Sequence, residues 1–424
     1  MISTLMVAAS LGYLGGCSDS DGSVNTLDTQ VVEGGQSSSG SADSEVSADS
    51  SAVGHDGTRP PSKGVSEVSG DCFFNSKPAP SSLSLSEITT VEVNQAPIWL
   101  FPVVDDGGQI YLSAEGGGGI KIAKVSMAEL EGANKKISPT WKTVISPEQI
   151  GGESVADHWH IFAHDRHWIV FSTQKATVGR LLVLSKDLDQ LALITLVNEM
   201  ALIEDEVPFV GPGGSFLPTN DMFLVEGSSS VHIGFFLPGT GHRLFGVDLS
   251  YTPSPNVDIG GKSYTHGNDA SALRTANGYL ALVPDTINAL AYSALHAIQF
   301  DNDWTPVCRV ELVGMAKTSL SMPSAVFLDI GELVIHSRLR PDAHAKGERP
   351  PPPKSGSPLQ TIDNTQVWRF VIGANGVVKQ QQAIDGIGPA FRPHTTVVGN
   401  RLLTAWDRVG HTYLRVDSIL SEEK

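Results

Sequence analysis

The sequence predicts an all-β fold, a single β-propeller of about six four-stranded blades, and three observations carry this prediction. First, the chain of 424 residues has 43 Gly and 25 Pro with 40% hydrophobic and only 18% charged residues, which is typical of a protein rich in strands and turns. Second, short apolar runs separated by Gly, Asn or Asp recur in a fixed order from residue 83 to the end. Third, each recurrence is long enough for the four strands of a propeller blade.

The N-terminal segment, residues 1–16, is uncharged and mostly apolar and ends in Leu14-Gly15-Gly16-Cys17. It resembles the lipobox of bacterial lipoproteins, although no Lys or Arg precedes the apolar run. The resemblance implies a signal peptide cleaved before Cys17, lipidation of that cysteine and anchoring to the membrane. Ser18 implies sorting to the outer membrane in enteric-type bacteria. The alternatives are an ordinary signal peptide or an apolar segment that packs, since sixteen residues fall short of the roughly 20 that a spanning helix needs.

Residues 17–82 are predicted to be a disordered acidic tether. Up to about residue 70 this segment consists mainly of Ser, Gly, Asp and Glu, with almost no aromatic residues. Such a composition buries too little apolar area to offset the entropy lost on ordering. We therefore expect the folded domain to occupy residues 83–424.

The net charge of −17 and the lack of a basic cluster interleaved with aromatic residues argue against nucleic acid as a partner. The sequence also has no P-loop, dinucleotide fingerprint, Cys-x-x-Cys pair or Gly-x-Ser-x-Gly elbow. No cofactor is therefore expected.

The repeated unit consists of a polar entrance, three clear apolar runs and a weaker fourth run. Such runs, separated by turn residues, predict strands. In chain order the clear runs are 98–104, 109–112 and 120–125; 157–163, 168–171 and 180–184; 222–225, 231–236 and 244–249; 268–273, 279–283 and 295–300; 324–328, 333–335 and 367–371; and 394–398, 402–405 and 413–416.

The polar residues at the six entrances are Gln95, His158, Asp221, Asp269, Ser324 and His394, at intervals of 63, 63, 48, 55 and 70 residues. The last unit ends after three strands. Residues 88–93 form an additional strand candidate before the first unit, and this strand would complete the last blade and close the ring. The rival folds are a two-sheet sandwich and two smaller β domains.

The chain has three cysteines. If Cys17 carries lipid, Cys72 and Cys308 remain as a pair in an oxidising compartment, and a disulfide between them is one prediction. Two unrelated buried thiols are the alternative.

The first strand of each propeller blade lines the central channel, so the polar entrances are expected to meet at one mouth. There, acids, imidazoles and a guanidinium provide hydrogen-bonding and acid/base groups. His158 and His160 lie on the same face of one strand and could share a metal ion, but histidines satisfied within the protein account for them better, and no metal is expected. The candidate site residues are Asp157, His158, His160, Asp221, His266, Asn268, Asp269, Arg392 and His394.

The Asp157-His158 and Asn268-Asp269 pairs that open inner strands, each followed by a turn, resemble those of bacterial propellers of the sialidase and polysaccharide-lyase type. The sialidase Ser-x-Asp-x-Gly-x-x-Trp box is missing, so the resemblance implies the architecture and no catalytic residue. The leading hypothesis is a lipid-anchored, non-catalytic propeller of the cell envelope that binds a protein or glycan partner. The alternative is a carbohydrate-active enzyme, a lyase or hydrolase, and the sequence leaves open whether the protein is an enzyme.

Overall fold

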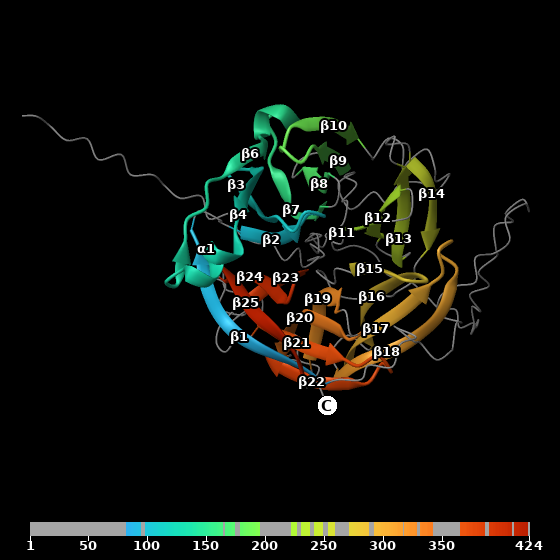
Figure 1. Cartoon of the computed structure of the whole chain (residues 1–424). Coiled ribbons are helices and arrows are strands. Elements are labelled where there is room, and N and C mark those ends of the chain that lie inside the picture. Colours follow the sequence, from blue (N-terminus) through green and yellow to red (C-terminus); the bar gives the residue numbers. More distant parts are fainter. Residues whose placement is uncertain are drawn as a thin grey trace, which may run out of the picture. The chain divides into compact units, whose positions relative to one another are not determined.

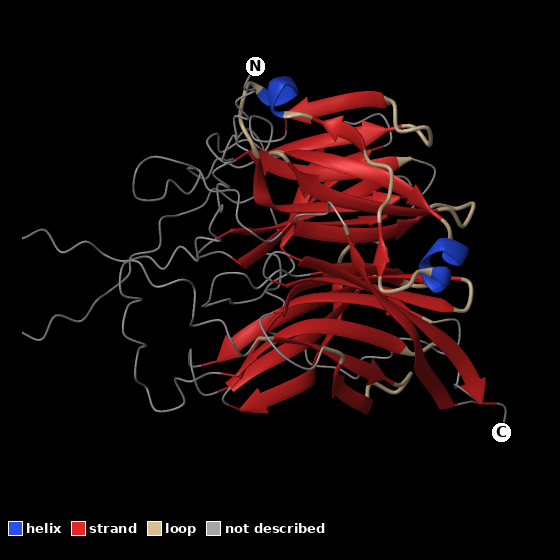
Figure 2. Ribbon diagram, turned by 90° about the vertical axis from the view of Figure 1, so that its left-hand side faces the viewer, coloured by secondary structure: helices blue, strands red, loops and turns tan. Residues whose placement is uncertain are grey.

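A computed structural model of the chain describes residues 82–94, 98–163, 166–173, 179–195, 222–226, 230–237, 241–248, 253–258, 271–287, 292–316, 318–328, 331–341, 365–385, 390–408 and 411–422. The chain divides into two units, Met1–Lys63 and Gly64–Lys424, and all described residues belong to the second. This unit is an all-β propeller. Figure 2 shows that its described residues are nearly all in strands, with two short helical segments.

Five sheets have the four strands of a propeller blade, and in each of them the strands pair with their neighbours in antiparallel order. In Figure 1 the first strand of each sheet lies near the common axis and the last at the periphery. The five sheets contain β2 (Ile98–Val104), β3 (Ile110–Gly116), β4 (Gly119–Val125) and β6 (Lys142–Ile145); β7 (Val155–Ala163), β8 (His167–Thr173), β9 (Gly179–Leu184) and β10 (Gln190–Thr195); β11 (Met222–Glu226), β12 (Ser230–Leu237), β13 (Gly241–Asp248) and β14 (Pro253–Asp258); β15 (Ser271–Thr275), β16 (Gly278–Ile287), β17 (Tyr292–Phe300) and β18 (Pro306–Ala316); and β19 (Thr318–Phe327), β20 (Leu333–Pro341), β21 (Gln366–Ile372) and β22 (Val378–Ala383).

A sixth sheet has five strands, in the order β23 (Ala390–Val398), β24 (Arg401–Arg408), β25 (His411–Glu422), β1 (Ser82–Val93) and β5 (Lys136–Ile137). The additional strand expected at residues 88–93 is therefore present, but it begins at Ser82. It pairs antiparallel with β25 from Ser82↔Glu422 to Glu92↔Tyr413. The two-residue strand β5, which the sequence analysis did not predict, adds to the end of β1 in parallel.

The first sheet also differs from the repeated pattern. Between β4 and β6 the chain forms the helix α1 (Met127–Gly132) and β5, and a 3-10 helix (Pro147–Ile150) follows β6. Ser126 begins α1 with a capping box, in which its hydroxyl accepts the Glu129 N–H and the Glu129 carboxylate accepts the Ser126 N–H. This reciprocal bonding stabilises a helix that has only six residues.

The hydrophobic core lies between neighbouring sheets. One cluster joins the β2–β6 sheet to the β7–β10 sheet, another joins the sheets of β15–β18 and β19–β22, and a third joins β23–β25 and β1 to β2–β4. Both faces of β8 and of β16 are therefore covered. This explains why the runs at residues 168–171 and 280–283, all of them buried, are continuously apolar and do not alternate between apolar and polar residues.

Of the hairpin turns that the structure describes in full, four share one geometry, at residues 105–109, 185–189, 301–305 and 373–377. In each, the first and fifth residues are joined by a backbone hydrogen bond, and the fourth residue donates its N–H to the first. That fourth residue has a positive φ and is Gly108, Leu188, Trp304 or Gly376. These are three-residue hairpin loops that end in a left-handed residue.

Substitution of Gly108 by alanine is expected to lower the free energy of unfolding by about 1 kcal/mol, because a Cβ is unfavourable in the left-handed region. Gly108 has a φ of +78°, and a Cβ there would meet no atom within 4 Å, so backbone strain is the whole effect. Urea unfolding would measure it. Gly132→Ala is the control, since Gly132 has equal space and no positive φ. Equal midpoints for the two variants would contradict the expectation.

Candidate functional site

The candidate site residues that the structure describes lie on strands near the axis, and four of the innermost strands are interrupted by a bulge. The register shifts between Ile98 and Phe101 in β2, between Val155 and Trp159 in β7, between Ser321 and Ser324 in β19 and between Phe391 and His394 in β23. A non-glycine residue with positive φ lies in three of these bulges, namely Trp99 (62°), Met322 (52°) and Arg392 (53°). Such backbone is costly for residues with a Cβ and is concentrated at functional sites.

The bulges define which residues are equivalent in different sheets. The first residues paired after the bulge are Phe101, Trp159, Ser324 and His394. The repeat alignment had instead placed Gln95 and His158 beside Ser324 and His394. For His158 the difference of one residue arises because the bulge of β7 has three unpaired residues where those of β19 and β23 have two. Gln95 precedes β2 and lies outside the described residues.

Four rings on the inner strands of the first, second and sixth sheets lie close together at this level. The Phe101 ring stacks on His394 with 3.6 Å between centroids, and the centroid of Trp159 lies 4.4 Å from that of Phe101. The His160 ring lies 5.5 Å from Phe101 and 6.2 Å from His394. We call Phe101, Trp159, His160 and His394 the mouth cluster.

Three nitrogens of the mouth cluster are buried and make no hydrogen bond: Trp159 Nε1, His160 Nδ1 and His394 Nε2. A buried polar atom without a partner costs roughly 1–3 kcal/mol. These three atoms therefore provide hydrogen-bonding capacity that a ligand can satisfy.

Both imidazoles of the cluster are neutral at pH 7. Burial lowers the pKa of His160 to about 4. Burial, followed by the nearby His160 and Arg392, holds the pKa of His394 well below its usual value. Each ring then has one N–H donor and one acceptor nitrogen, and neither ring can supply a proton as a general acid near pH 7.

Arg392 and Trp99 lie beside the mouth cluster. The Arg392 guanidinium lies over the Trp99 ring in a cation–π contact. The backbone N–H of Trp99 donates to both carboxylate oxygens of Asp407, at 3.1 and 2.9 Å. Asp407 is only 5% exposed and also accepts the Thr412 hydroxyl.

The sequence-predicted residues fall into three groups. His160, Arg392 and His394 are brought together as described above. Asp157 and His158 lie in the bulged stretch of β7, but their side chains are outside the described residues. Asp221, His266, Asn268 and Asp269 lie wholly outside the described residues.

Of the cysteines, Cys308 lies in β18 and is disulfide-bonded. Cys17 and Cys72 are outside the described residues. The pairing of Cys72 with Cys308 and the lipidation of Cys17 remain predictions.

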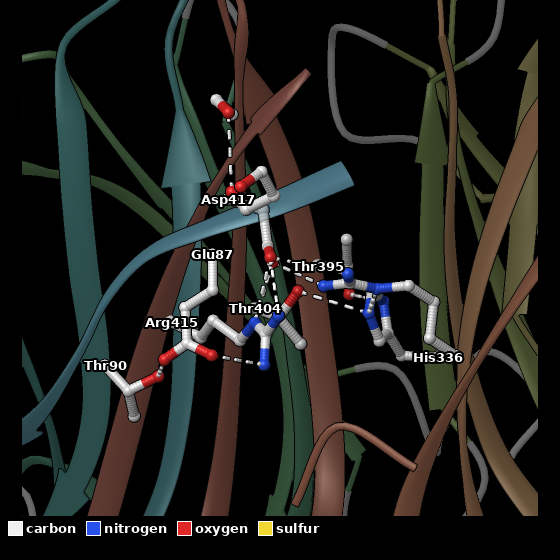
Figure 3. Close-up of polar contacts among 10 residues, drawn as sticks. Glu87, Thr90, His336, Thr395, Thr404, Arg415 and Asp417 are labelled. Carbon is white, nitrogen blue, oxygen red and sulfur yellow. Dashed lines mark hydrogen bonds and ion pairs between the residues drawn. The ribbon is translucent and has the colours of Figure 1, made fainter. Parts of the chain in front are cut away.

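A second polar cluster, shown in Figure 3, is buried between the fifth and sixth sheets. Arg369 forms an ion pair with Asp417, which also accepts hydrogen bonds from Arg415. Arg369 Nε donates to His336 Nε2 at 2.9 Å, and His336 Nδ1 lies 2.8 Å from the hydroxyl of Thr395. This pattern assigns the proton of the neutral imidazole to Nδ1.

The second cluster continues to β1, whose Glu87 forms an ion pair with Arg415 at 2.9 Å. Burial and the two arginines hold the pKa of His336 well below its usual value. His336, Arg369 and Asp417 are 0% exposed. The polar atoms of this cluster are thus bonded to one another, so its chemistry is structural: it joins β1, β20, β21, β23 and β25.

The sequence analysis did not select Trp99, Phe101, Asp407 or the residues of the second cluster. A signal existed for Arg369, because it interrupts the apolar run of β21, and a charged residue in a buried run must be paired. No sequence signal pointed to Asp407, whose role depends on a bulge 308 residues away.

Among the described residues, no group of three His, Cys, Asp or Glu side chains could hold a metal ion. In the same residues there is no helix that is long and apolar enough to span a membrane.

The fold and the inner-strand cluster define a β-propeller protein with a candidate site on its inner strands. No family model and no curated protein matches the chain. Solved structures similar to it include a protein of unknown function from Dyadobacter fermentans (TM-score 0.48, 12% identity, covering 79% of this chain and 99% of that one) and AofleA from Arthrobotrys oligospora (TM-score 0.48, 9% identity, 81% and 90%). A Trypanosoma rangeli sialidase is similar too (TM-score 0.45, 10% identity), and the match spans 79% of this chain and 59% of the sialidase. At these identities the likeness concerns the fold alone.

Proposed function

We propose that this protein is a lipid-anchored, non-catalytic propeller of the cell envelope, attached through Cys17 to the outer membrane, that binds a neutral, hydroxyl-rich glycan at the mouth cluster. The five-stranded sheet is taken as the sixth blade, with β1 closing the ring. One observation carries the binding proposal: buried nitrogens of Trp159, His160 and His394 lack partners where three sheets meet.

The chemistry of these groups favours a neutral glycan over a charged ligand. Neutral imidazoles and an indole N–H exchange hydrogen bonds with hydroxyl groups without needing a charge on the ligand. A site that hydrogen-bonds hydroxyls also rejects compounds that lack them, because its own polar atoms then stay unpaired.

Binding of the full chain to a glycan array tests this proposal. His160→Phe and His394→Phe keep a ring in place and remove the nitrogens, so each is expected to weaken binding about tenfold, the equivalent of one hydrogen bond of about 1.4 kcal/mol. His167→Phe is the matched control, since His167 is buried in the next strand of the same sheet and packs on Tyr111 outside the mouth cluster.

Two outcomes would contradict the proposal. The first is wild-type binding that His160→Phe and His394→Phe leave unchanged. The second is cleavage of a polysaccharide by the full chain that His394→Phe abolishes, and this result would establish the alternative, a carbohydrate-active enzyme.

A further inference from the structure

Asp407 is the described carboxylate that contacts the bulge beside the mouth cluster, and it comes from a different sheet. It lies in β24, paired in the ladder with Phe391 and Thr412. Its carboxylate crosses to the first sheet and accepts the Trp99 N–H with both oxygens. Because Trp99 is separated from it by 308 residues, this contact also joins the beginning of the propeller to its end.

The hydrogen bond holds a strained segment. Trp99 has a φ of 62°, which a residue with a Cβ seldom adopts unless the surroundings enforce it. The Trp99 N–H lies in the bulge, outside the paired residues of β2 and β3, and Asp407 supplies an acceptor of the kind that a buried backbone donor needs.

The same bulge determines the positions of two aromatic rings, those of Trp99 and Phe101. It turns the Trp99 ring beneath the Arg392 guanidinium and places Phe101 against His394. A change at Asp407 is therefore transmitted through the backbone of β2 to Arg392 and His394, although Asp407 is not itself a member of the mouth cluster.

We infer that Asp407 is a positioning residue whose ionised carboxylate holds the mouth cluster in its binding arrangement, so that acidification releases this arrangement and weakens ligand binding. The binding part of this inference rests on the proposed function. The positioning part rests on the hydrogen bonds and the bulge alone.

The electrostatics of Asp407 place its ionisation between pH 5.0 and 7.5. Burial raises the pKa of Asp407 to about 6. Arg392 and the hydrogen bonds from Trp99, Thr412 and Leu100 lower this pKa, but by less than burial raises it. Among the described residues, the charged or titratable group that acts on Asp407 is Arg392 of β23, while β2 and β25 offer it backbone N–H groups and the Thr412 hydroxyl. Above about pH 6 the carboxylate is ionised and accepts these bonds; below it, the proton removes its attraction to Arg392. His160 and His394 stay neutral throughout.

Nuclear magnetic resonance of the indole N–H groups tests the positioning without any ligand. In the full chain, with its seven tryptophans labelled with 15N, the Trp99 signal is assigned from its loss in Trp99→Phe. Between pH 7.5 and 5.0 it is expected to shift with a midpoint near 6, and Asp407→Asn is expected to abolish the shift. Asp385→Asn is the control, because this buried carboxylate accepts Trp406 Nε1 and leaves Trp99 untouched.

A second variant keeps the test decisive if Asp407→Asn does not fold. Thr412→Val removes a hydrogen bond that lowers the pKa of Asp407, so the midpoint should move above 6. A Trp99 signal that does not titrate, or that titrates with the same midpoint in Thr412→Val, would overturn the inference.

The glycan array then separates the inference from the proposed function. Wild-type binding is expected to fall about tenfold from pH 7.5 to 5.0, and Asp407→Asn is expected to bind at pH 7.5 as weakly as the wild type does at pH 5.0. If no glycan binds at either pH but the Trp99 signal titrates as expected, only the proposed function is contradicted. Binding that does not change with pH defeats the inference and leaves the proposed function standing.

Discussion

Asp417→Asn is expected to lower the free energy of unfolding by about 3–5 kcal/mol, the usual cost of removing one partner from a buried ion pair. Asparagine keeps the shape of the side chain but removes the charge that Arg369 and Arg415 share. Arg369 is 0% exposed, so its guanidinium would stay buried without a counter-charge. Equilibrium urea unfolding of the full chain measures the loss.

Two further variants show whether burial causes this effect. Asp189→Asn breaks the pair with Lys142, in which both side chains are at least half exposed, and should leave the unfolding midpoint unchanged. The double variant Arg369→Met, Asp417→Leu removes both charges and should be less destabilised than Asp417→Asn, because no uncompensated charge replaces the Arg369–Asp417 pair. A loss below about 1 kcal/mol in Asp417→Asn would contradict the expectation.

A chain that begins at Asn94, and so lacks β1, is expected to lose the cooperative unfolding transition of the whole propeller. The deletion exposes the edge of β25 along its pairing with β1, removes Val91 and Val93 from the core and leaves Arg415 without Glu87. Burial of the two valines alone is worth about 3–6 kcal/mol. Differential scanning calorimetry and circular dichroism would follow the change.

The control for this deletion is a chain of residues 64–424, which lacks only the first unit and should unfold as the full chain does. A synthetic peptide of residues 82–93, added to the chain that begins at Asn94, should restore stability in proportion to its concentration. Equal melting temperatures for the two truncated chains would show that β1 contributes nothing to closure.

Strand positions were predictable from the sequence because a strand that is buried on both faces is a continuous run of apolar residues. The run at residues 168–171 is continuous and apolar since it lies between two sheets, and the structure has it in β8. The strand before the first unit was predicted because the last unit lacked a fourth strand. In the structure this strand, β1, pairs with β25. The sequence analysis made no prediction for the interval between β4 and β6, where the structure has α1 and β5.

The candidate site was only partly predictable. His160, Arg392 and His394 were selected as polar residues at strand entrances, and their side chains do lie near one another. The apolar ring that contacts both imidazoles, Phe101, was not selected, because nothing in its own segment distinguishes it from a core residue.

The sequence by itself determined the all-β class, the repeat and the strands, since these depend on the spacing of apolar residues and on turn chemistry within a few residues. Only the tertiary structure decided the arrangement of the site. The bulges shift each inner strand by unpaired residues, and the contacts of Asp407 with Trp99 and of Phe101 with His394 join residues about 300 positions apart. Side-chain contacts at such separation are set by how the sheets pack around the axis, and no local pattern records them.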